Sequence, residues 1–204
     1  LELARKHADR DAENALNRIE KESLRLNEMI GQLLDLASLD EEDGTQSFSR
    51  FDLTRLIADV VRDAVFEAHG RFEAAEPVFV RGDVELLRRA IDNVVRNALT
   101  YTAEGTAVEV LMTGDEFSGS VGVTVCDHGP GIPDDVLDKI FEPFYRVQQS
   151  RDRRTGGAGL VLAIAQRAVK RCGGSISATN RRPSGLEIQV RLPVETGPAS
   201  TKDA

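Results

Sequence analysis

The stretch Asp127-His128-Gly129-Pro130-Gly131-Ile132-Pro133 combines residue types suited to binding a small molecule. The β-branched apolar run before it, residues 121–126, predicts a buried strand that ends in an acid. An aspartate there can accept a hydrogen bond from an exocyclic amine such as that of adenine, and glycines let a ligand approach the backbone closely. A rigid turn between a strand and a helix is the alternative that this stretch alone leaves open.

Two asparagines, Asn93 and Asn97, lie four residues apart on a predicted helix that Asp83 caps and that runs to about Thr100. They project from one face of the helix, where asparagine is unusual because it prefers caps and turns. Either they form a satisfied network in the core, or their amide oxygens hold Mg²⁺ and the phosphate oxygens around it. Tyr101 follows the helix and can stack on an aromatic base.

A polar, basic loop at residues 147–158 runs into the segment Gly156-Gly157-Ala158-Gly159. These glycines lead into a helix predicted over Leu160–Arg171, and the free N–H groups at a helix N-terminus bind anions. The arginines of the loop are either solvated charges or part of a lid that closes over phosphates.

Apolar periodicity predicts the elements that hold these residues in place. Strands are predicted at residues 51–53, 77–82, 108–112, 121–126, 175–179 and 186–192. Helices are predicted at residues 54–69, 83–100, 134–140 and 160–171. The fold class that accounts for this set is α+β, a two-layer α/β sandwich in which helices cover one face of a mixed, mostly antiparallel sheet.

The N-terminal region, residues 1–43, follows a different pattern. An apolar stripe with the spacing of a coiled-coil seam occurs at Leu16, Ile19, Ser23, Leu26, Ile30, Leu33 and Ala37. The polar stretch His7–Asp11 predicts a turn, so this region is expected to be a helical hairpin. We expect a dimeric four-helix bundle through residues 12–39, because one hairpin buries little surface. Packing of the hairpin on its own domain is the alternative.

The acidic stretch at residues 40–45 predicts a boundary between the hairpin domain, residues 1–43, and a second domain at residues 50–195. Residues 196–204 are polar and are expected to be a disordered tail. The chain begins in helical sequence without a methionine, so we expect it to be part of a longer protein.

Composition argues against several classes of protein. The net charge of −8 is unlike that of a nucleic-acid-binding protein, which would present a basic surface. No apolar run is long enough to cross a bilayer, so membrane attachment is expected only through segments upstream of this chain. The two cysteines, Cys126 and Cys172, belong to no metal-binding motif, which indicates buried thiols.

Four segments together resemble the sensor histidine kinases of bacterial two-component systems, within the gyrase/Hsp90/histidine kinase/MutL ATPase superfamily. In the family's order, they are similar to its N, G1, F and G2 boxes: Asp92–Tyr101, Asp127–Pro133, Phe141–Arg146 and Gly157–Leu162. The nearest likeness is to envelope-stress members of the CpxA type. Residues 1–40 resemble part of the family's dimerisation and histidine-phosphotransfer domain.

The resemblance implies a protein-histidine kinase that moves the γ-phosphoryl group of ATP to a histidine and then to an aspartate of a response regulator. ATP and Mg²⁺ would be its cofactors, with Asn97 as metal ligand, Asp127 as acceptor from adenine and Tyr101 packed on the base. The implied ATP-binding residues are Asn93, Arg96, Asn97, Tyr101, Asp127, Gly129, Gly131, Ile132, Phe141, Arg146, Gly157, Gly159, Leu160 and Leu162. The chain would be the cytoplasmic part of a dimeric bacterial inner-membrane protein.

The sequence departs from the family pattern in three places. The phospho-accepting histidine motif is absent, so we expect the acceptor upstream of residue 1 and no autophosphorylation by this fragment. Thr100 replaces a basic residue. Val161 replaces the last glycine of the G2 box, where a β-branched side chain would crowd the phosphates and weaken nucleotide binding.

Two other functions stay open. One is a dimerising interaction fragment with a degenerate nucleotide site. The other is a different ATPase of the superfamily, against which Asn93 argues, because those hydrolases carry a catalytic acid at that position.

Overall fold

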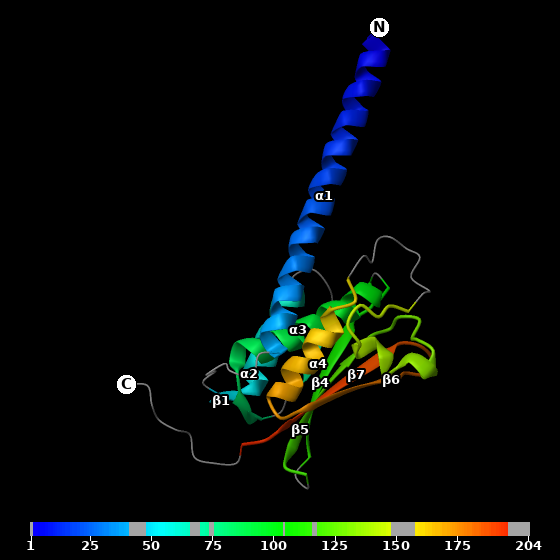
Figure 1. The fold of residues 1–204 in the computed structure, drawn as a ribbon. Coiled ribbons are helices and arrows are strands. Elements are labelled where there is room, and N and C mark those ends of the chain that lie inside the picture. The colour runs from blue at the N-terminus through cyan, green and yellow to red at the C-terminus, as the bar shows by residue number, and fades with distance from the viewer. Residues whose placement is uncertain are drawn as a thin grey trace.

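The computed structural model describes residues 2–40, 48–65, 70–73, 76–103, 105–115, 118–147 and 158–195. Its helices (α), 3₁₀ turns (η) and strands (β) follow in this order: α1 Glu2–Asp40, β1 Ser49–Asp52, α2 Leu53–Val65, β2 Gly70–Glu73, β3 Phe79–Gly82, α3 Val84–Tyr101, β4 Val108–Asp115, β5 Ser120–Cys126, η1 Asp134–Val136, η2 Lys139–Phe141, α4 Val161–Arg171, β6 Ser175–Asn180 and β7 Leu186–Pro193. Figure 1 shows α1 as a long rod that leads away from a layered body.

The body is built on a five-stranded sheet in the order β2-β4-β5-β7-β6. Strand β2 runs parallel to β4, and the other neighbours are antiparallel. A separate two-stranded sheet joins β1 to β3. The predicted two-layer sandwich with a mixed, mostly antiparallel sheet is therefore confirmed.

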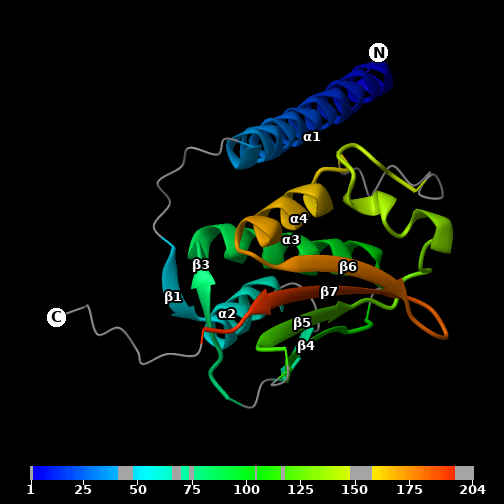
Figure 2. The same ribbon diagram turned by 60° about the horizontal axis from the view of Figure 1, so that its bottom comes forward.

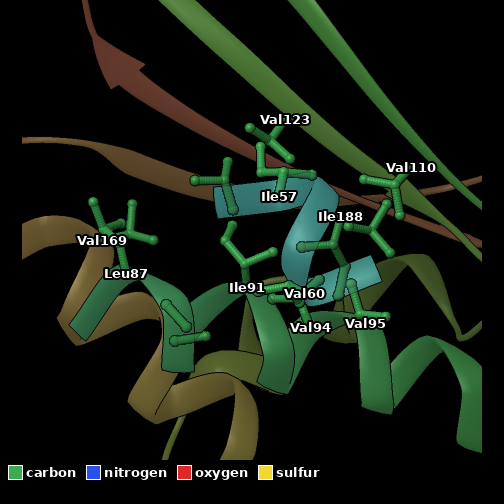
Figure 3. Packing of buried hydrophobic residues seen from close by; sticks show 14 of the residues in the cluster. Ile57, Val60, Leu87, Ile91, Val94, Val95, Val110, Val123, Val169 and Ile188 are labelled. Carbon is green, nitrogen blue, oxygen red and sulfur yellow. The ribbon is translucent and has the colours of Figure 1, made fainter. Parts of the chain in front are cut away.

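Helices α2, α3 and α4 cover one face of the five-stranded sheet, and the core lies between these two layers (Figure 2). Alternate residues of a strand point to the same face, so β5 and β7 each present a row of apolar side chains to the helices. In the close view, Ile57 of α2, Ile91 of α3 and Val169 of α4 belong to one cluster with Val123 and Ile188 of the sheet (Figure 3). All five side chains are buried.

Helix α3 begins where the sequence predicts, because Asp83 caps it. The Asp83 side chain accepts a hydrogen bond from the Leu86 N–H at 3.0 Å. The buried side of the helix consists of Leu87, Ala90, Ile91, Val94, Val95 and Ala98. The asparagines at 93 and 97 lie beside this apolar side and are half-buried.

The N-terminal region is one continuous helix, so the predicted turn at His7–Asp11, and with it the predicted helical hairpin, is wrong. Polar residues continue a helix unless glycine or proline interrupts it. The first glycine is Gly31 and the first proline is Pro77, so nothing in the sequence breaks the helix at residues 7–11. The predicted linker lies almost entirely outside the described residues.

Helix α1 contacts the body near its C-terminal end. Leu36 is 8% exposed and is clustered with Leu160, Ala163 and Ile164 at the start of α4. The Arg167 side chain of α4 donates a long hydrogen bond, 3.5 Å, to the Leu36 carbonyl oxygen.

The predicted seam of α1 does not take part in that contact. Its leucines and isoleucines are 40–66% exposed in the described structure: Leu16, Ile19, Leu26, Ile30 and Leu33. No described helix is both long and apolar enough to cross a membrane.

The structure of the body differs from the prediction in two elements, one that was not predicted and one that was predicted wrongly. Strand β2 was not expected, because four residues are too few to display a period of two. The helix predicted at residues 134–140 is wrong, since that segment forms the short 3₁₀ turns η1 and η2 between Pro133 and Pro143. The predicted tail at residues 196–204 lies outside the described residues.

Candidate functional site

Asp127 lies directly after β5, with a side chain only 4% exposed. Its Oδ1 accepts hydrogen bonds from the N–H groups of Gly129, at 2.8 Å, and Leu186, at 2.9 Å. The Asp127 N–H donates to the Leu186 carbonyl oxygen at 2.9 Å. Among the described residues, Oδ2 has no hydrogen-bond partner. One oxygen is thus held by backbone donors while the other is left to accept from a ligand.

The end of α3 packs on the loop of residues 127–133, which we call the G1 loop. A Cβ atom at Gly129 would lie 2.8 Å from the Tyr101 carbonyl oxygen, so only glycine allows this approach. The His128 N–H donates to Thr102 Oγ1 at 3.3 Å. Tyr101 is 40% exposed. The structure therefore brings the tyrosine and Asp127 to the same end of the sandwich.

Asn93 and Asn97 are half-buried on successive turns of α3. Neither amide makes a hydrogen bond within the described part of the chain, so the alternative of a satisfied core network has no support there. Two neighbours are engaged elsewhere: Arg96 Nε donates to Asp92 Oδ2 at 2.8 Å, and Thr100 Oγ1 donates to the Arg96 carbonyl oxygen at 2.7 Å. Arg96 is an exposed residue and forms an ion pair along its own helix.

The F and G2 segments are in contact. The Phe144 N–H donates to the Gly159 carbonyl oxygen at 2.9 Å. Gly159 has a φ of 74°, and a Cβ atom there would lie 2.7 Å from the Tyr145 carbonyl oxygen. The side chain of Arg146 lies beside the same glycine, with Cγ 3.2 Å from that Cβ position. The predicted site residues Arg146 and Gly159 are therefore neighbours.

The N-terminus of α4 has no side-chain cap, in contrast to that of α3. Within the described part of the chain, the first-turn N–H groups of α4 therefore have no side-chain acceptor, and such groups can donate to a ligand. Leu160 is fully buried and Leu162 is 9% exposed, so these two predicted site residues can meet a ligand only through their backbone. Val161, half-buried, is the first residue of the helix.

Two further predicted site residues have a packing role. Phe141 is 6% exposed and belongs to the main core cluster, and Ile132 is half-buried against the same cluster. Gly157 and the loop arginines Arg151, Arg153 and Arg154 lie outside the described residues.

No pattern in the sequence indicates the polar group that lies on the sheet face pointing away from the helices. His128 Nε2 lies 3.1 Å from Glu109 Oε1, and Arg181 donates to the second oxygen of Glu109 at 3.3 Å. Cys126 Sγ donates to Glu187 Oε2 at 3.8 Å. Burial raises the pKa of the Cys126 thiol to about 11, with the nearby Arg181 acting in the opposite direction. Only the strand register brings these residues together.

The fold belongs to a class of α+β domains in which helices cover one face of a mixed sheet. Residues 82–196, more than half of the chain, match the family model described as histidine kinase-, DNA gyrase B-, and HSP90-like ATPase. The chain belongs to this family.

Its relatives include sensor histidine kinases. The sensor histidine kinase CpxA of Escherichia coli (strain K12) is 34% identical over 185 residues, which cover 88% of this chain and 39% of that protein. The probable sensor histidine kinase TcrY of Mycobacterium tuberculosis is 35% identical over 186 residues, which cover 89% of this chain and 38% of that protein. The predicted resemblance to this family is confirmed, and the chain spans about two-fifths of the length of these relatives.

Solved structures show the same fold. The crystal structure of full-length ShkA in complex with AMPPNP has a TM-score of 0.71 and 26% identity, over 84% of this chain and 36% of that chain. The mycobacterial sensor histidine kinase MprB has a TM-score of 0.63 and 28% identity, over 74% of this chain and 99% of that chain.

Proposed function

We propose that this chain is the ATP-binding core of a sensor histidine kinase, which transfers the γ-phosphoryl group of ATP to a histidine and then to a response-regulator aspartate. The observation that carries the proposal is the carboxylate of Asp127. It is buried, held through one oxygen by two backbone N–H groups, and without a described partner on the other oxygen. That arrangement fits an exocyclic amine such as that of adenine, which is a hydrogen-bond donor and a poor acceptor.

The adenine end of the site would be completed by Tyr101 and the G1 loop. The tyrosine is partly exposed and its backbone packs on Gly129, so its ring is available beside the loop. A base that donates its amine to Asp127 would then have an aromatic side chain within reach for stacking. Ile132 supplies apolar surface at the other end of the loop.

Mg²⁺ would be held by Asn97, with Asn93 supporting the phosphates. The donor set fits this ion, because amide oxygens are hard ligands and both side chains lack a described protein partner. Mg²⁺ held there would supply positive charge that stabilises the phosphate oxygens. The protein's own part at this position is to hold two amides four residues apart on a rigid helix.

The phosphate end would lie at the start of α4. The uncapped N–H groups of its first turn can donate to phosphate oxygens, and the helix dipole favours negative charge there. Arg146 lies beside Gly159, two residues before that helix, and can supply positive charge there. Catalysis would rest on orientation and charge stabilisation, since none of the three histidines of this chain lies in a phospho-accepting motif.

The partners follow from this role. A response-regulator receiver domain would accept the phosphoryl group, and a second copy of the chain would pair with the exposed seam of α1. Attachment to the bacterial inner membrane would come from segments other than these residues, which would lie in the cytoplasm.

The variant Asp127→Asn tests the proposal. Asparagine keeps the oxygen that accepts from Gly129 and Leu186, but it replaces the free oxygen with an N–H₂ group that opposes the adenine amine. Calorimetric titration with a non-hydrolysable ATP analogue and Mg²⁺ should show a loss of affinity of about a hundredfold. The affinity for the matching GTP analogue should fall less, because guanine presents a carbonyl oxygen at that position.

Asp138→Asn is the matched control, since Asp138 is exposed and its side chain makes no cap hydrogen bond. Equal affinities of Asp127→Asn and the control for the ATP analogue would contradict the assignment of Asp127. A parent chain that binds no ATP analogue would instead favour the dimerising interaction fragment with a degenerate site.

A further inference from the structure

The last residue of β6, Asn180, makes three side-chain hydrogen bonds, two to Ile132 of the G1 loop and one to Asp134, which directly follows the loop. Asn180 Oδ1 accepts from the Ile132 N–H at 3.0 Å. Its Nδ2 donates to the Ile132 carbonyl oxygen and to Asp134 Oδ1, both at 2.6 Å. The amide therefore satisfies both backbone groups of Ile132, a residue 48 positions away in the sequence.

Glycines permit the close approach of the G1 loop and the β6–β7 turn. Gly131 has a φ of 71°, and a Cβ atom there would lie 2.9 Å from Asn180 Oδ1. Gly185, in the turn, has a φ of 115°, and a Cβ atom there would lie 2.2 Å from the Asp127 carbonyl oxygen. A side chain at Gly185 would collide with the Asp127 backbone, and one at Gly131 would be strained by the positive φ and would displace the Asn180 amide.

The turn thus holds the G1 loop at both ends. Leu186, directly after the turn, donates to Asp127 Oδ1, and Asn180, directly before it, holds Ile132. A polar residue that served only to end a strand would bond locally, within two or three positions, as asparagine usually does. Both polar atoms of the Asn180 amide instead bond to residues 46 and 48 positions away, and two of the three bonds go to Ile132 of the G1 loop.

We propose that Asn180 is a positioning residue for nucleotide recognition, which fixes Ile132 relative to the Asp127 carboxylate. This inference rests on the proposed function of the G1 loop. Without the amide, the loop between Asp127 and Ile132 gains conformations that do not fit the base. The nucleotide then binds only those molecules whose loop has the competent conformation. Its apparent affinity is lowered in proportion to the fraction of molecules in that conformation.

The first test needs no nucleotide. In the Asn180→Ala variant, the Ile132 N–H should lose its protection from hydrogen exchange, because its acceptor is gone. The Gly129 N–H should stay protected, because it is held by Asp127. Retained protection at Ile132 in the variant would overturn the inference, whatever the chain binds.

The second test measures binding. Asn180→Ala should weaken an ATP analogue and ADP by the same factor, about tenfold, because both carry the same base. Thr179→Ala, one residue earlier on β6 and exposed, is the control and should bind like the parent chain. Equal affinity of Asn180→Ala and the control would overturn the inference, as would a loss confined to the ATP analogue, which would indicate an effect on the γ-phosphate.

A charge exchange separates positioning from general loss of packing. Asn180→Asp places a carboxylate beside Asp134 Oδ1 and removes both donors, so it should weaken binding at least as much as alanine does. The double variant Asn180→Asp with Asp134→Asn restores a donor between the two side chains and should recover part of the affinity. An absence of recovery would contradict the role of the amide.

These outcomes separate the inference from the proposed function. If the parent chain binds no ATP analogue, the proposed function fails and the positioning role fails with it. If the parent chain binds and Asn180→Ala binds equally, the proposed function stands and only the positioning role fails.

Discussion

Val161 is one of the residues at which the sequence departs from the family pattern, and it lies at the proposed phosphate end of the site. It is half-buried and begins α4, whose N–H groups have no side-chain cap. A β-branched side chain there restricts how closely a phosphate can approach these donors. We expect Val161→Gly to bind an ATP analogue roughly three- to tenfold more tightly by calorimetry.

Adenosine is the control ligand for Val161→Gly, because it carries no phosphate and should bind the variant and the parent chain equally. Glycine also lowers helix stability, so the melting temperature of the variant has to be followed alongside. An unchanged affinity for the ATP analogue would mean that Val161 does not crowd the phosphates.

Cys126 links stability to alkaline pH. Burial raises its pKa from 9.0 to about 11 in the folded chain. Between these values the unfolded chain releases the thiol proton while the folded chain keeps it, so the free energy of unfolding falls as the pH rises. The contribution of the protonated Cys126 thiol to the free energy of unfolding is fully present below the pKa of the unfolded chain. It is lost as the pH rises through the pKa of the folded chain.

Denaturant titrations at several alkaline pH values check this linkage. Cys126→Ser should lose less stability than the parent chain across the window between the two pKa values. Parallel pH profiles of the two chains would contradict a raised pKa. Burial also raises the pKa of Cys172, so both chains must keep that residue.

At the scale of elements, we expect that the contact between α1 and α4 can be lost while the sandwich stays folded. Leu36 is buried against Leu160 and its neighbours, whereas Leu34 is 66% exposed. Leu36→Ala should remove roughly 2–3 kcal/mol from this contact and leave the melting temperature of the body nearly unchanged. Hydrogen exchange at the end of α1 is the measurement, and it should become faster.

Leu34→Ala is the matched leucine-to-alanine control and should leave that exchange unchanged. A fall in the melting temperature of the body in Leu36→Ala would instead mean that α1 and the sandwich unfold as one unit.

Periodicity predicted the elements whose apolar side faces one layer. Helix α3 and strands β5 and β7 are such elements, and for α3 the Asp83 cap added a local start signal. Periodicity gave no guidance for polar segments. Residues 7–11 suggested a turn, but the segment contains no glycine or proline and the helix continues through it. Periodicity also failed for β2, which owes its extended form to pairing with β4 and not to its own short sequence.

The candidate site was predictable where its residues form a recognisable pattern within one continuous segment. The G1 loop, the paired asparagines of α3 and the glycine-rich start of α4 are local patterns of this kind. Asn180 and Glu109 are not, because their partners lie far away along the chain and only the fold brings them together. A polar residue with a remote partner has no periodic signature.

At the scale of the whole molecule, the exposed seam of α1 predicts self-association. Ile30 is 54% exposed and lies on the seam, while Leu34 is 66% exposed and lies off it. A charge placed in a coiled-coil seam is desolvated on pairing, so Ile30→Glu should shift the chain toward the monomer. Sedimentation velocity measures the change.

Leu34→Glu is the control and should sediment like the parent chain. Equal sedimentation of all three chains as monomers would contradict pairing through the seam.

The continuous helix α1 is long enough to carry two separate contact surfaces. Its 39 residues span about 58 Å at the usual rise per residue. Leu33 on the seam and Leu36 against α4 are three residues apart, and the helical repeat separates them by about 60° around the axis. A partner that covers the seam therefore leaves the direction of Leu36 open to α4. Because the sandwich contacts α1 through Leu36, rotation of the helix about its own axis would carry the proposed nucleotide site with it.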